Sequence, residues 1–432
     1  MRLSDIVDFN PRTTLPRSGE LPFVDMAALP TSGRDIAEIA WRSVGSSGAK
    51  FRNGDTLLAR ITPCLENGKG AKVSHLPEPG MGQGSTEFIV MRAKSASDED
   101  FVYYLSRHPA FRSFAIQQMV GTSGRQRVSW QSLADFEIDD LSITQRQSAG
   151  QVLSALDDKI ELNRRMNETL EAMAQAIFCD WFVDFGPVRR KMAGVTDPVA
   201  IMGGLTPDPI RAAELATLFP TGFDVNDLPV DWDEEPVIEQ ANWVNGAAYK
   251  KMHFVAPGEG LPVIKIAELK AGVTSATGFT NTDLGSRYRI DDGELLFSWS
   301  GNPDTSIDTF IWTGGPAWLN QHIFAVRPNG SRTLGFLFAM LKYLNPKFAE
   351  IARDKQTTGL GHVTKDDLKR LRVVVPTKAV EAAFDKLMTP IFQKLQAALL
   401  ENRTLAETRD YLLPRLMSGE VSVGDAALEI AA

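Results

Sequence analysis

The stretch IELNRRMNETLEAMAQAIFCDW, from Ile160 to Trp181, contains the pattern that decides the fold. Some of its residues recur at alternating steps of three and four, which keeps them on one face of a helix. These are Ile160, Asn163, Asn167, Leu170, Ala174, Ile177 and Trp181. The same spacing returns near the C-terminus in Ile391, Leu395, Ala398, Asn402, Leu405, Arg409, Leu412 and Leu416. This spacing is typical of a coiled-coil seam, so we predict two long helices that pair with each other.

Two asparagines occupy matching positions of these stripes, in NETL at Asn167 and in NRTL at Asn402. A polar residue at a seam position lowers stability but fixes the register of the paired helices. We therefore predict that Asn167 and Asn402 set the helix register in an antiparallel pair about 50 Å long, at about 1.5 Å per residue. The alternative is that each helix packs only on its own globular domain.

The matching stripes are part of a longer internal repeat, in which the second half follows the first at a shift of 235 to 240 residues. Apolar, glycine and hydroxyl residues recur in the same order, as expected if each copy forms the same unit of short strands, turns and helices. The matching segments are PFVDMAAL (from Pro22) and PVIKIAEL (Pro262), NGDTLLAR (Asn53) and DGELLFSW (Asp292), EFIVMR (Glu87) and HIFAVR (His322), TSGRQRVSWQSLADFEI (Thr122) and TTGLGHVTKDDLKRLRV (Thr357).

The repeat predicts an α+β fold: two similar globular domains with two long antiparallel helices between them, related by a pseudo-two-fold axis. The linking stretch between the copies is rich in Gly, Pro and Asp, and we expect one short helix in it, from Ala212 to Phe219. The predicted segments are a first domain at 1–144, a first long helix at 145–186, a connector at 187–224, a second domain at 225–375, a second long helix at 376–420 and a tail at 421–432.

The composition indicates an ordinary soluble protein of the reducing cytoplasm. The chain has a net charge of -8, so binding to a polyanion would require local basic patches. Cys64 and Cys179 are its only cysteines and give neither a disulfide framework nor a zinc spacing. We find no signal peptide and no apolar run long enough to span a membrane, so no membrane association is expected.

Catalytic motifs are missing from the sequence. GKGAK at Gly68 lacks the phosphate-loop frame, and no GxSxG motif occurs. NPKF at Asn345 is similar to an aminomethyltransferase motif but has Lys347 at its second proline position, and we expect it to mark a helix end. The five histidines lack metal-ligand spacing. We therefore predict no catalytic residue, no metal and no cofactor on this chain.

Basic loops in the first copy have the chemistry of a DNA-binding surface. Lys50 to Lys72 carries five basic and two acidic residues, and Arg107 to Arg127 carries four arginines and no carboxylate. Lys and Arg neutralise phosphates, whereas Arg, Gln and Asn can read base edges. The candidate DNA-binding residues are Arg60, Lys69, Lys72, Thr122, Ser123, Gly124, Arg125, Gln126 and Arg127. The alternative is that these loops only face water.

The second copy keeps the apolar frame but changes the polar residues, as expected if it reads a different sequence. Leu360 and His362 stand where the first copy has Arg125 and Arg127, so its potential for base contact is weaker. Trp299 could equally belong to the core. The candidate residues here are Ser298, Trp299, Ser300, Gly301, Asn302, Thr358, Gly359, Gly361 and His362.

Several stretches together resemble the specificity subunit of type I restriction-modification enzymes. They are LSDIVDFNPR (from Leu3), PFVDMAAL, GDTLLARITPCLENGKGA (Gly54), GSTEFIVMR (Gly84), SWQSLADFEI (Ser129), the segment LDDKIELNRRMNETLEAMAQAIFCDWFVDFGPVRRKMAG (Leu156) and LPRLMSGEV (Leu413). The resemblance covers essentially the whole chain. It implies two target-recognition domains, each binding one half of a split, asymmetric sequence in double-stranded DNA, with the two long helices setting the spacer between the halves.

The resemblance also implies partners. Two DNA methylation subunits would dock on the helices and carry S-adenosylmethionine, and motor-nuclease subunits could join them. Two other functions remain open: a protein-protein adaptor built on the helical pair, and a fused restriction-methylation enzyme, which the missing methyltransferase motif disfavours. Steep salt dependence of duplex binding would distinguish the DNA-binding protein from the adaptor.

Overall fold

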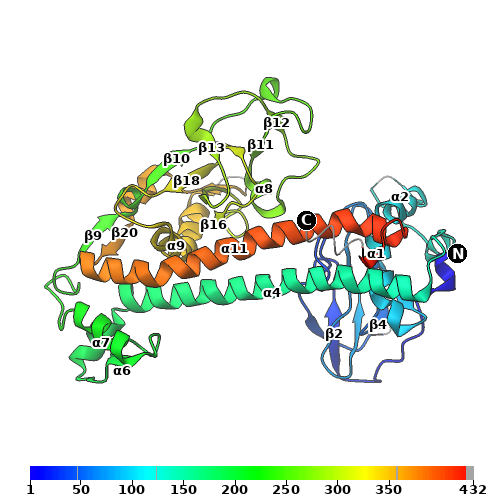
Figure 1. Cartoon of the computed structure of the whole chain (residues 1–432), viewed down its shortest axis with the longest axis horizontal. Helices are drawn as coiled ribbons and strands as arrows, with labels where there is room; N and C mark the ends of the chain where they lie inside the picture. The colour runs from blue at the N-terminus through cyan, green and yellow to red at the C-terminus, as the bar shows by residue number, and fades with distance from the viewer. Residues whose placement is uncertain (46, 123, 357–358, 425–432) are drawn as a thin grey trace. The chain divides into compact units, whose positions relative to one another are not determined.

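The computed structural model describes residues 1–45, 47–122, 124–356 and 359–424. The chain forms two compact units (Figure 1). Unit 1 comprises Met1–Leu162 and Thr404–Ala432, and unit 2 comprises Asn163–Arg403. Two long helices, α4 (Ile143–Phe182) and α11 (Lys378–Met417), each contribute to both units.

Unit 1 contains two four-stranded sheets and three short helices. The first sheet is entirely antiparallel, whereas the second has one parallel pair, β2 with β7. The first has the order β1 (Val7–Phe9), β8 (Phe88–Ala93), β5 (Thr56–Ala59), β6 (Gly70–Lys72), and the second β3 (Ala40–Ser43), β2 (Glu20–Val24), β7 (Met81–Gly84), β4 (Ala49–Arg52). The helices are α1 (Glu99–Arg107), α2 (Pro109–Gln117) and α3 (Trp130–Ala134).

Unit 2 repeats both sheets with the same strand order and the same directions, including the one parallel pair, β11 with β17. Its first sheet is β10 (Asn242–Asn245), β18 (Ile323–Arg327), β14 (Leu295–Ser298), β16 (Asp308–Ile311), and its second is β12 (Phe279–Thr280), β11 (Leu261–Ile264), β17 (Ala317–Leu319), β13 (Arg289–Ile290). Two short ladders pair β15 (Ser300–Gly301) with β19 (Gly361–His362), and β20 (Arg372–Val375) with β9 (Asp233–Pro236). Its remaining helices include α8 (Ile266–Ala271), α9 (Leu334–Asp354) and α10 (Lys365–Arg370).

The repeated sequence segments therefore fall on corresponding elements of the two units. TLLA of the first copy is β5 and LLFS of the second is β14, and both strands are fully buried. A short apolar run after a glycine turn gives such a strand because both of its faces are covered by other elements. The predicted α+β fold with two similar sheet-containing domains is confirmed.

In unit 1 the apolar stripes of α4 and α11 close the core over α1 and α2. Leu153 of α4 lies in one buried cluster with Leu412 and Leu416 of α11. Asp157 of α4 meets Arg409 of α11, with 2.6 Å between Oδ1 and Nη1. The buried residues of this half of the stripe are therefore covered by the other helix as well as by the sheet domain.

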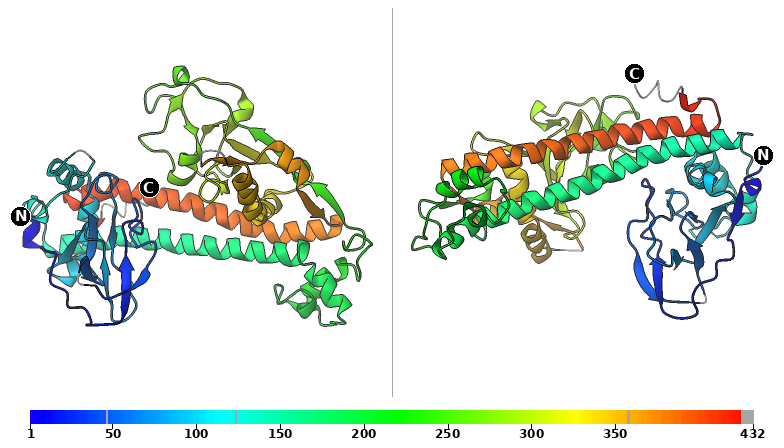
Figure 2. Two further views of the ribbon diagram at one scale, coloured as in Figure 1. Left: turned by 180° about the vertical axis from the view of Figure 1, so that it is seen from behind. Right: turned by 60° about the horizontal axis from the view of Figure 1, so that its bottom comes forward.

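In unit 2 the two helix segments lie side by side in each view (Figures 1 and 2) and run antiparallel. Asn163 contacts Asn402 at one end of this segment, and Trp181 contacts Phe384 at the other, with ring centroids 5.7 Å apart. Residues that meet have numbers with a constant sum, as an antiparallel pair requires. The buried helix α9 completes this core on the sheet side.

Asn402 contacts Asn163, the other asparagine of the first stripe. Asn163 Nδ2 donates to Asn402 Oδ1 at 3.0 Å and to Glu401 Oε2 at 2.7 Å. Asn163 is fully buried, whereas Asn167 is half-buried one turn further along α4. The buried Asn163 Nδ2 reaches both of these acceptors in one register only, although Asn163 Oδ1 has no hydrogen-bond partner among the described residues. The sequence predicted this register role for Asn167 and Asn402, and Asn163 takes the place of Asn167 opposite Asn402.

The connector contains three short helices where we expected one: α5 (Gly186–Met192), α6 (Pro198–Ile201) and α7 (Pro209–Leu218). Asp197 and Asp208 cap α6 and α7, with a proline at the first helical position of each. The same aspartates and prolines led us to predict a loop from the composition, but here they start helices. The NPKF stretch also differs from our expectation, because it lies inside α9 and not at a helix end.

Helix α4 lies so close to α1 at Gly150 that no larger side chain fits there. A Cβ atom there would lie 2.9 Å from both the Asp100 Cβ and the Phe101 amide nitrogen. Gly150→Ala should therefore lower the free energy of unfolding of unit 1 by about 1–3 kcal/mol through overpacking, exceeding the gain of about 1 kcal/mol in helix propensity. Urea denaturation measures this. Gly33→Ala is the control, since its Cβ would make only ordinary contacts at 3.6 Å, and an unchanged Gly150→Ala protein would contradict the packing argument.

In the part of the chain that the structure describes, no helix has the combination of length and apolar character needed to cross a membrane.

Candidate nucleic-acid interface

The basic loop of the first copy folds as a hairpin with an exposed tip. Val120 and Arg127 exchange both backbone hydrogen bonds, at 3.0 and 2.9 Å, and the Arg125 amide donates to the Thr122 carbonyl. Gly121 has φ 138°, and a Cβ there would lie 2.9 Å from the Arg125 carbonyl oxygen, so this turn requires glycine. Thr122, Gly124 and Arg125 are exposed, and Ser123 lies outside the described residues.

The hairpin is held against the segment that follows β5. The Thr62 amide donates to the Gln126 carbonyl at 3.0 Å, the Gln126 amide donates to Thr62 Oγ1, and the Val128 amide donates to the Arg60 carbonyl at 2.9 Å. The structure thus brings together three of the predicted residues, Arg60, Gln126 and Arg127, from segments more than 60 residues apart.

Arg60 and Arg127 share one carboxylate, that of Glu87. Arg127 Nε and Nη2 donate to Glu87 at 2.9 and 2.7 Å, and Arg60 Nε lies 3.8 Å from the same group. The hydrogen bonds from Arg127 hold the pKa of Glu87 below its ordinary value. Glu87 is therefore ionised at neutral pH and orients both guanidinium groups. Glu87 was not among the predicted site residues, because in the sequence it stands at the start of an apolar strand pattern.

Lys69 and Lys72 make contacts within the domain. Lys69 Nζ donates to the Met26 carbonyl at 2.8 Å, and Lys72 Nζ pairs with Asp100 at 2.5 Å with its side chain only 15% exposed. Both ammonium groups thus already have partners that support the loop. Neither is an open cation like that of Arg125.

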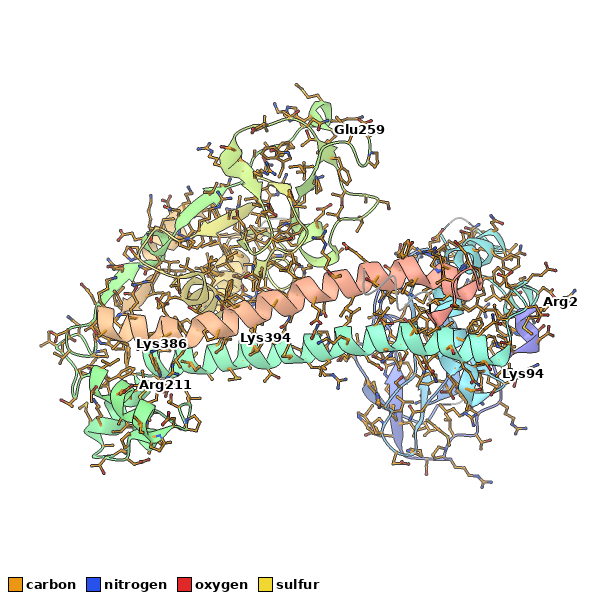
Figure 3. All side chains as sticks on the ribbon, in the orientation of Figure 1. Arg2, Lys94, Arg211, Glu259, Lys386 and Lys394 are labelled. Atoms are coloured by element: carbon orange, nitrogen blue, oxygen red, sulfur yellow. The ribbon has the colours of Figure 1, made fainter. Side chains whose placement is uncertain are left out.

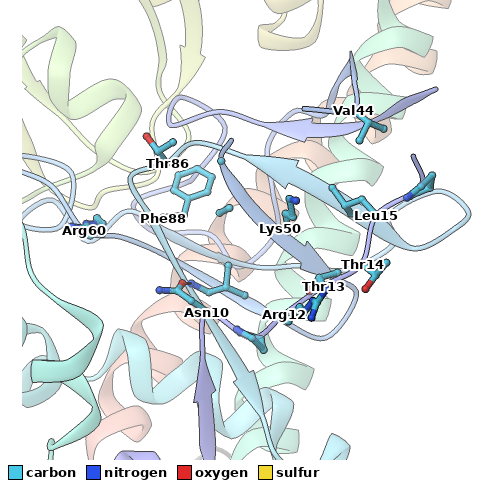
Figure 4. Close-up of a pocket in the computed structure, with 15 residues that line it drawn as sticks. Asn10, Arg12, Thr13, Thr14, Leu15, Val44, Lys50, Arg60, Thr86 and Phe88 are labelled. Carbon is cyan, nitrogen blue, oxygen red and sulfur yellow. Dashed lines mark hydrogen bonds between the residues drawn. The ribbon is translucent and has the colours of Figure 1, made fainter. Parts of the chain in front are cut away.

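A groove of about 610 Å³ lies beside Arg60 (Figure 4). Arg12, Lys50 and Arg60 bring three positive charges to it, and none of the described residues that line it is acidic. Arg12 was not among the predicted site residues, although Pro11 and Pro16 indicate the loop that carries it. The remaining lining residues are Asn10, Pro11, Thr13, Thr14, Leu15, Pro16, Val44, Gly48, Ala49, Thr86, Phe88 and Val90.

The groove loop is tied to the sheet by its polar side chains. Asn10 exchanges hydrogen bonds with the Val90 backbone, and Thr13 Oγ1 accepts from Arg92 Nη2 at 2.9 Å. Arg92 in turn forms a two-point ion pair with the buried Asp55. The Arg12 side chain is exposed between these anchored positions, and the two hydroxyl residues Thr13 and Thr14 follow it.

In unit 2 the corresponding segments also meet. Ser300 pairs with His362 and Gly301 with Gly361 in the β15–β19 ladder. Trp299 is half-buried, and its Nε1 donates to Asn245 Oδ1 at 2.9 Å while its ring contacts His322. Trp299 is therefore at the edge of the core, with part of its surface open.

The other candidates of unit 2 have different positions. Ser298 is fully buried on β14, so its hydroxyl cannot reach a macromolecular ligand in this structure. Asn302 is exposed, and its side chain accepts from the amides of Asp304 and Thr305. Gly359 is exposed, and Thr358 lies outside the described residues.

The described residues contain no group of three or more His, Cys, Asp or Glu side chains that could hold a metal ion. The two interfaces offer hydrogen-bond donors, positive charge and aromatic surface. These are groups for binding a ligand; a nucleophile with an adjacent base is not among them.

Comparison with known proteins agrees with this geometry. Residues 229–407 match the family described as Type I restriction modification DNA specificity domain. The chain is 26% identical over 328 residues to the Type I restriction enzyme HindI specificity subunit of Haemophilus influenzae, covering 68% of this chain and 71% of that protein. It is 23% identical over 339 residues to the MjaIX specificity subunit of Methanocaldococcus jannaschii, covering 75% and 69%.

The fold is also found in a solved structure. The S subunit of a type I restriction-modification system from M. genitalium superposes with a TM-score of 0.50 at 14% identity, covering 96% of this chain and 95% of that one. The internal repeat, the two sheet domains and the sequence matches agree, and this chain is similar to the specificity subunits of type I restriction-modification enzymes.

Proposed function

We propose that this chain is the noncatalytic DNA sequence-specificity subunit of a type I restriction-modification system. The observation that carries the proposal is the exposed hairpin with Arg125 and Arg127, beside a groove with Arg12 and Lys50 and no acidic lining residue. The groove cations Arg12 and Lys50 have no acidic residue among the described lining residues and can attract phosphates, whereas Arg127 is paired with Glu87 and offers its remaining donors to a base. The matching relatives are type I restriction enzyme specificity subunits, which supports the same function.

In this proposal the target is bipartite and asymmetric. Residues 1–144 and 225–375 are the two target-recognition domains, each reading one half. The common backbone frame and different side chains of the two interfaces support this, because Arg60 and Arg127 in one domain correspond to Trp299 and His362 in the other. Arg12 and Lys50 would contact the sugar-phosphate backbone, which positions the domain without reading sequence.

The proposed partners are two DNA methylation subunits, which bind S-adenosylmethionine and dock on the paired helices, and motor-nuclease subunits in the complete enzyme, all in the cytoplasm. Exposed side chains on the outer face of the helices leave room for docking. Lys386 and Lys394 of α11, eight residues apart and labelled in Figure 3, are both exposed.

Salt dependence of duplex binding tests the proposal against a protein-protein adaptor. With about six phosphate contacts, affinity should fall about a thousandfold between about 50 and 200 mM salt. Fluorescence anisotropy with a labelled duplex measures this. Affinity that changes little with salt, or no binding at all, would favour the adaptor.

The hairpin arginines should govern one half-site. Arg125→Ala with Arg127→Ala is expected to lower discrimination at one half by about tenfold or more, because each arginine fork on a base is worth about 1–3 kcal/mol. Sequencing of duplexes selected from a randomised pool measures both half-sites. Arg2→Ala with Lys94→Ala removes the same charge from exposed positions of unit 1 (Figure 3) and serves as the control. Equal loss at both halves would contradict the assignment.

A further inference from the structure

The two units contain a corresponding cluster of three side chains on one backbone frame. In unit 1 the Arg60 amide donates to the Glu87 carbonyl at 3.0 Å, and in unit 2 the Trp299 amide donates to the His322 carbonyl at 3.3 Å. The next link also recurs, since Val128 donates to Arg60 and Val363 donates to Trp299.

A third link brings the hairpin residue to the same place in both units. Ile61 bridges Arg127 in unit 1, and Ser300 pairs with His362 in unit 2. The positions of Arg60, Glu87 and Arg127 are therefore those of Trp299, His322 and His362. Because the backbone links are the same in both units, the two clusters differ only in their side chains.

In the unit 1 cluster Glu87 holds the Arg127 guanidinium by hydrogen bonds, and the Arg60 guanidinium lies 3.8 Å from the same carboxylate. Glu87 takes the Nε edge of Arg127, and Nη1 makes a long hydrogen bond of 3.5 Å to the Arg125 carbonyl, which leaves one hydrogen each on Nη1 and Nη2 for a ligand. Arg60 Nε is buried near Glu87 without a hydrogen bond in the described structure, while the residue also lines the basic groove. Two like charges can share this space because the carboxylate lies between them.

The unit 2 cluster has an indole and two imidazoles in the same three positions. The Trp299 and His322 rings meet edge to face with centroids 5.7 Å apart. Trp299 Nε1 is occupied by Asn245, and His322 Nε2 lies 3.1 Å from Gln321 Nε2. This cluster has no guanidinium fork among its three residues, so it cannot make the bidentate contact that arginine makes with guanine.

We propose that Glu87 is a positioning residue that aims Arg127 and Arg60 at the acceptor edge of a guanine in one half-site, and that His322 holds the equivalent position in the domain that reads the other half. This inference rests on the proposed function. The two domains share one backbone frame, and the inference attributes their different half-sites to the side chains at three positions of it. It adds Glu87 and His322 to the residues that determine specificity.

Selection from a randomised duplex pool with the full chain tests the inference, comparing wild type with Glu87→Gln, Arg127→Lys and His322→Ala. We expect Glu87→Gln and Arg127→Lys to reduce guanine preference at the same base pair of one half-site by about tenfold, since glutamine cannot hold two cations and lysine lacks the fork. His322→Ala should change only the other half-site.

Glu66→Gln is the matched control: it removes the same charge from an exposed carboxylate in the neighbouring loop and should leave the motif unchanged. The melting temperature separates positioning from folding, because positioning predicts an altered motif at an unaltered melting temperature. An unaltered motif in Glu87→Gln and Arg127→Lys, or equal loss at both half-sites, would overturn the inference. A wild-type protein that selects no motif would instead overturn the proposed function.

Discussion

Asp157→Ala is expected to lower the free energy of unfolding of unit 1 by about 3 kcal/mol, because it leaves a buried arginine without its main partner. Arg409 Nη1 donates to Asp157 Oδ1 at 2.6 Å, and their side chains are only 11% and 6% exposed. The Tyr104 hydroxyl donates to the other oxygen of Asp157, also at 2.6 Å. Burial, with the Asp157 charge second, raises the pKa of Tyr104, so its hydroxyl stays protonated and remains a donor.

Asp410→Ala is the matched control for this prediction. Asp410 bonds the same guanidinium at 2.8 Å but is 67% exposed, so its loss should cost less than about 1 kcal/mol. Replacing both partners, as in Asp157→Leu with Arg409→Met, should recover part of the stability, because no charge of the pair remains buried although the Tyr104 hydroxyl loses its acceptor. Urea denaturation of the three variants measures the differences. Equal effects of Asp157→Ala and Asp410→Ala would contradict the view that burial makes this pair important.

The repeated sheets could be predicted from sequence because a short run of apolar residues after a turn indicates a buried strand. NGDTLLAR and DGELLFSW each place a turn before an apolar run, and both runs became the buried central strands β5 and β14. The helices were predictable for the same reason, since their stripes are continuous over many turns. Two of the three helices of the connector were not predicted, because their apolar side chains are fixed only by packing within the core of unit 2.

The asparagine pairing shows a limit of reasoning from a repeat. Aligning the copies at a shift of 235 makes Asn167 equivalent to Asn402, but equivalent residues in an antiparallel pair do not face each other. Residues that meet have numbers with a constant sum, and this brings Asn163 to Asn402. Equivalence follows from sequence alone, whereas contact also requires the axial offset of the helices, which side-chain packing sets.

The sequence predicted which loops form the candidate site, but not how their side chains contact one another. Arg60, Gln126 and Arg127 were identified by their chemistry, and the structure brings them together. The repeat aligns Glu87 with His322, but neither residue was predicted to belong to its cluster. Each stands directly before a strand and was interpreted only as part of the strand pattern. The groove at Arg12 depends on a loop anchored through Asn10 and Thr13, and such long-range contacts leave no local pattern.

Phe384→Ala should have the largest effect in unit 2, lowering its free energy of unfolding by about 4 kcal/mol. Phe384 of α11 is fully buried where α4, α9 and α11 meet. Removing its ring leaves a cavity that these three helices cannot easily fill, and it also removes several edge-to-face contacts. The rings around it, with centroid distances, are Phe182 at 4.8 Å, Phe336 at 5.6 Å, Trp181 at 5.7 Å and Phe178 at 6.0 Å.

Two comparisons make this prediction specific to the aromatic cluster. Phe384→Leu keeps most of the volume and should cost less than about 1.5 kcal/mol, whereas Lys386→Ala, at an exposed position two residues away (Figure 3), should stay within about 0.5 kcal/mol of wild type. Chemical denaturation followed by tryptophan fluorescence suits the measurement, since Trp181 contacts Phe384 directly. If Phe384→Ala were no more destabilising than Phe384→Leu, the site would have collapsed around the smaller side chain, and α4 and α11 would then owe their pairing in unit 2 to contacts elsewhere along the seam.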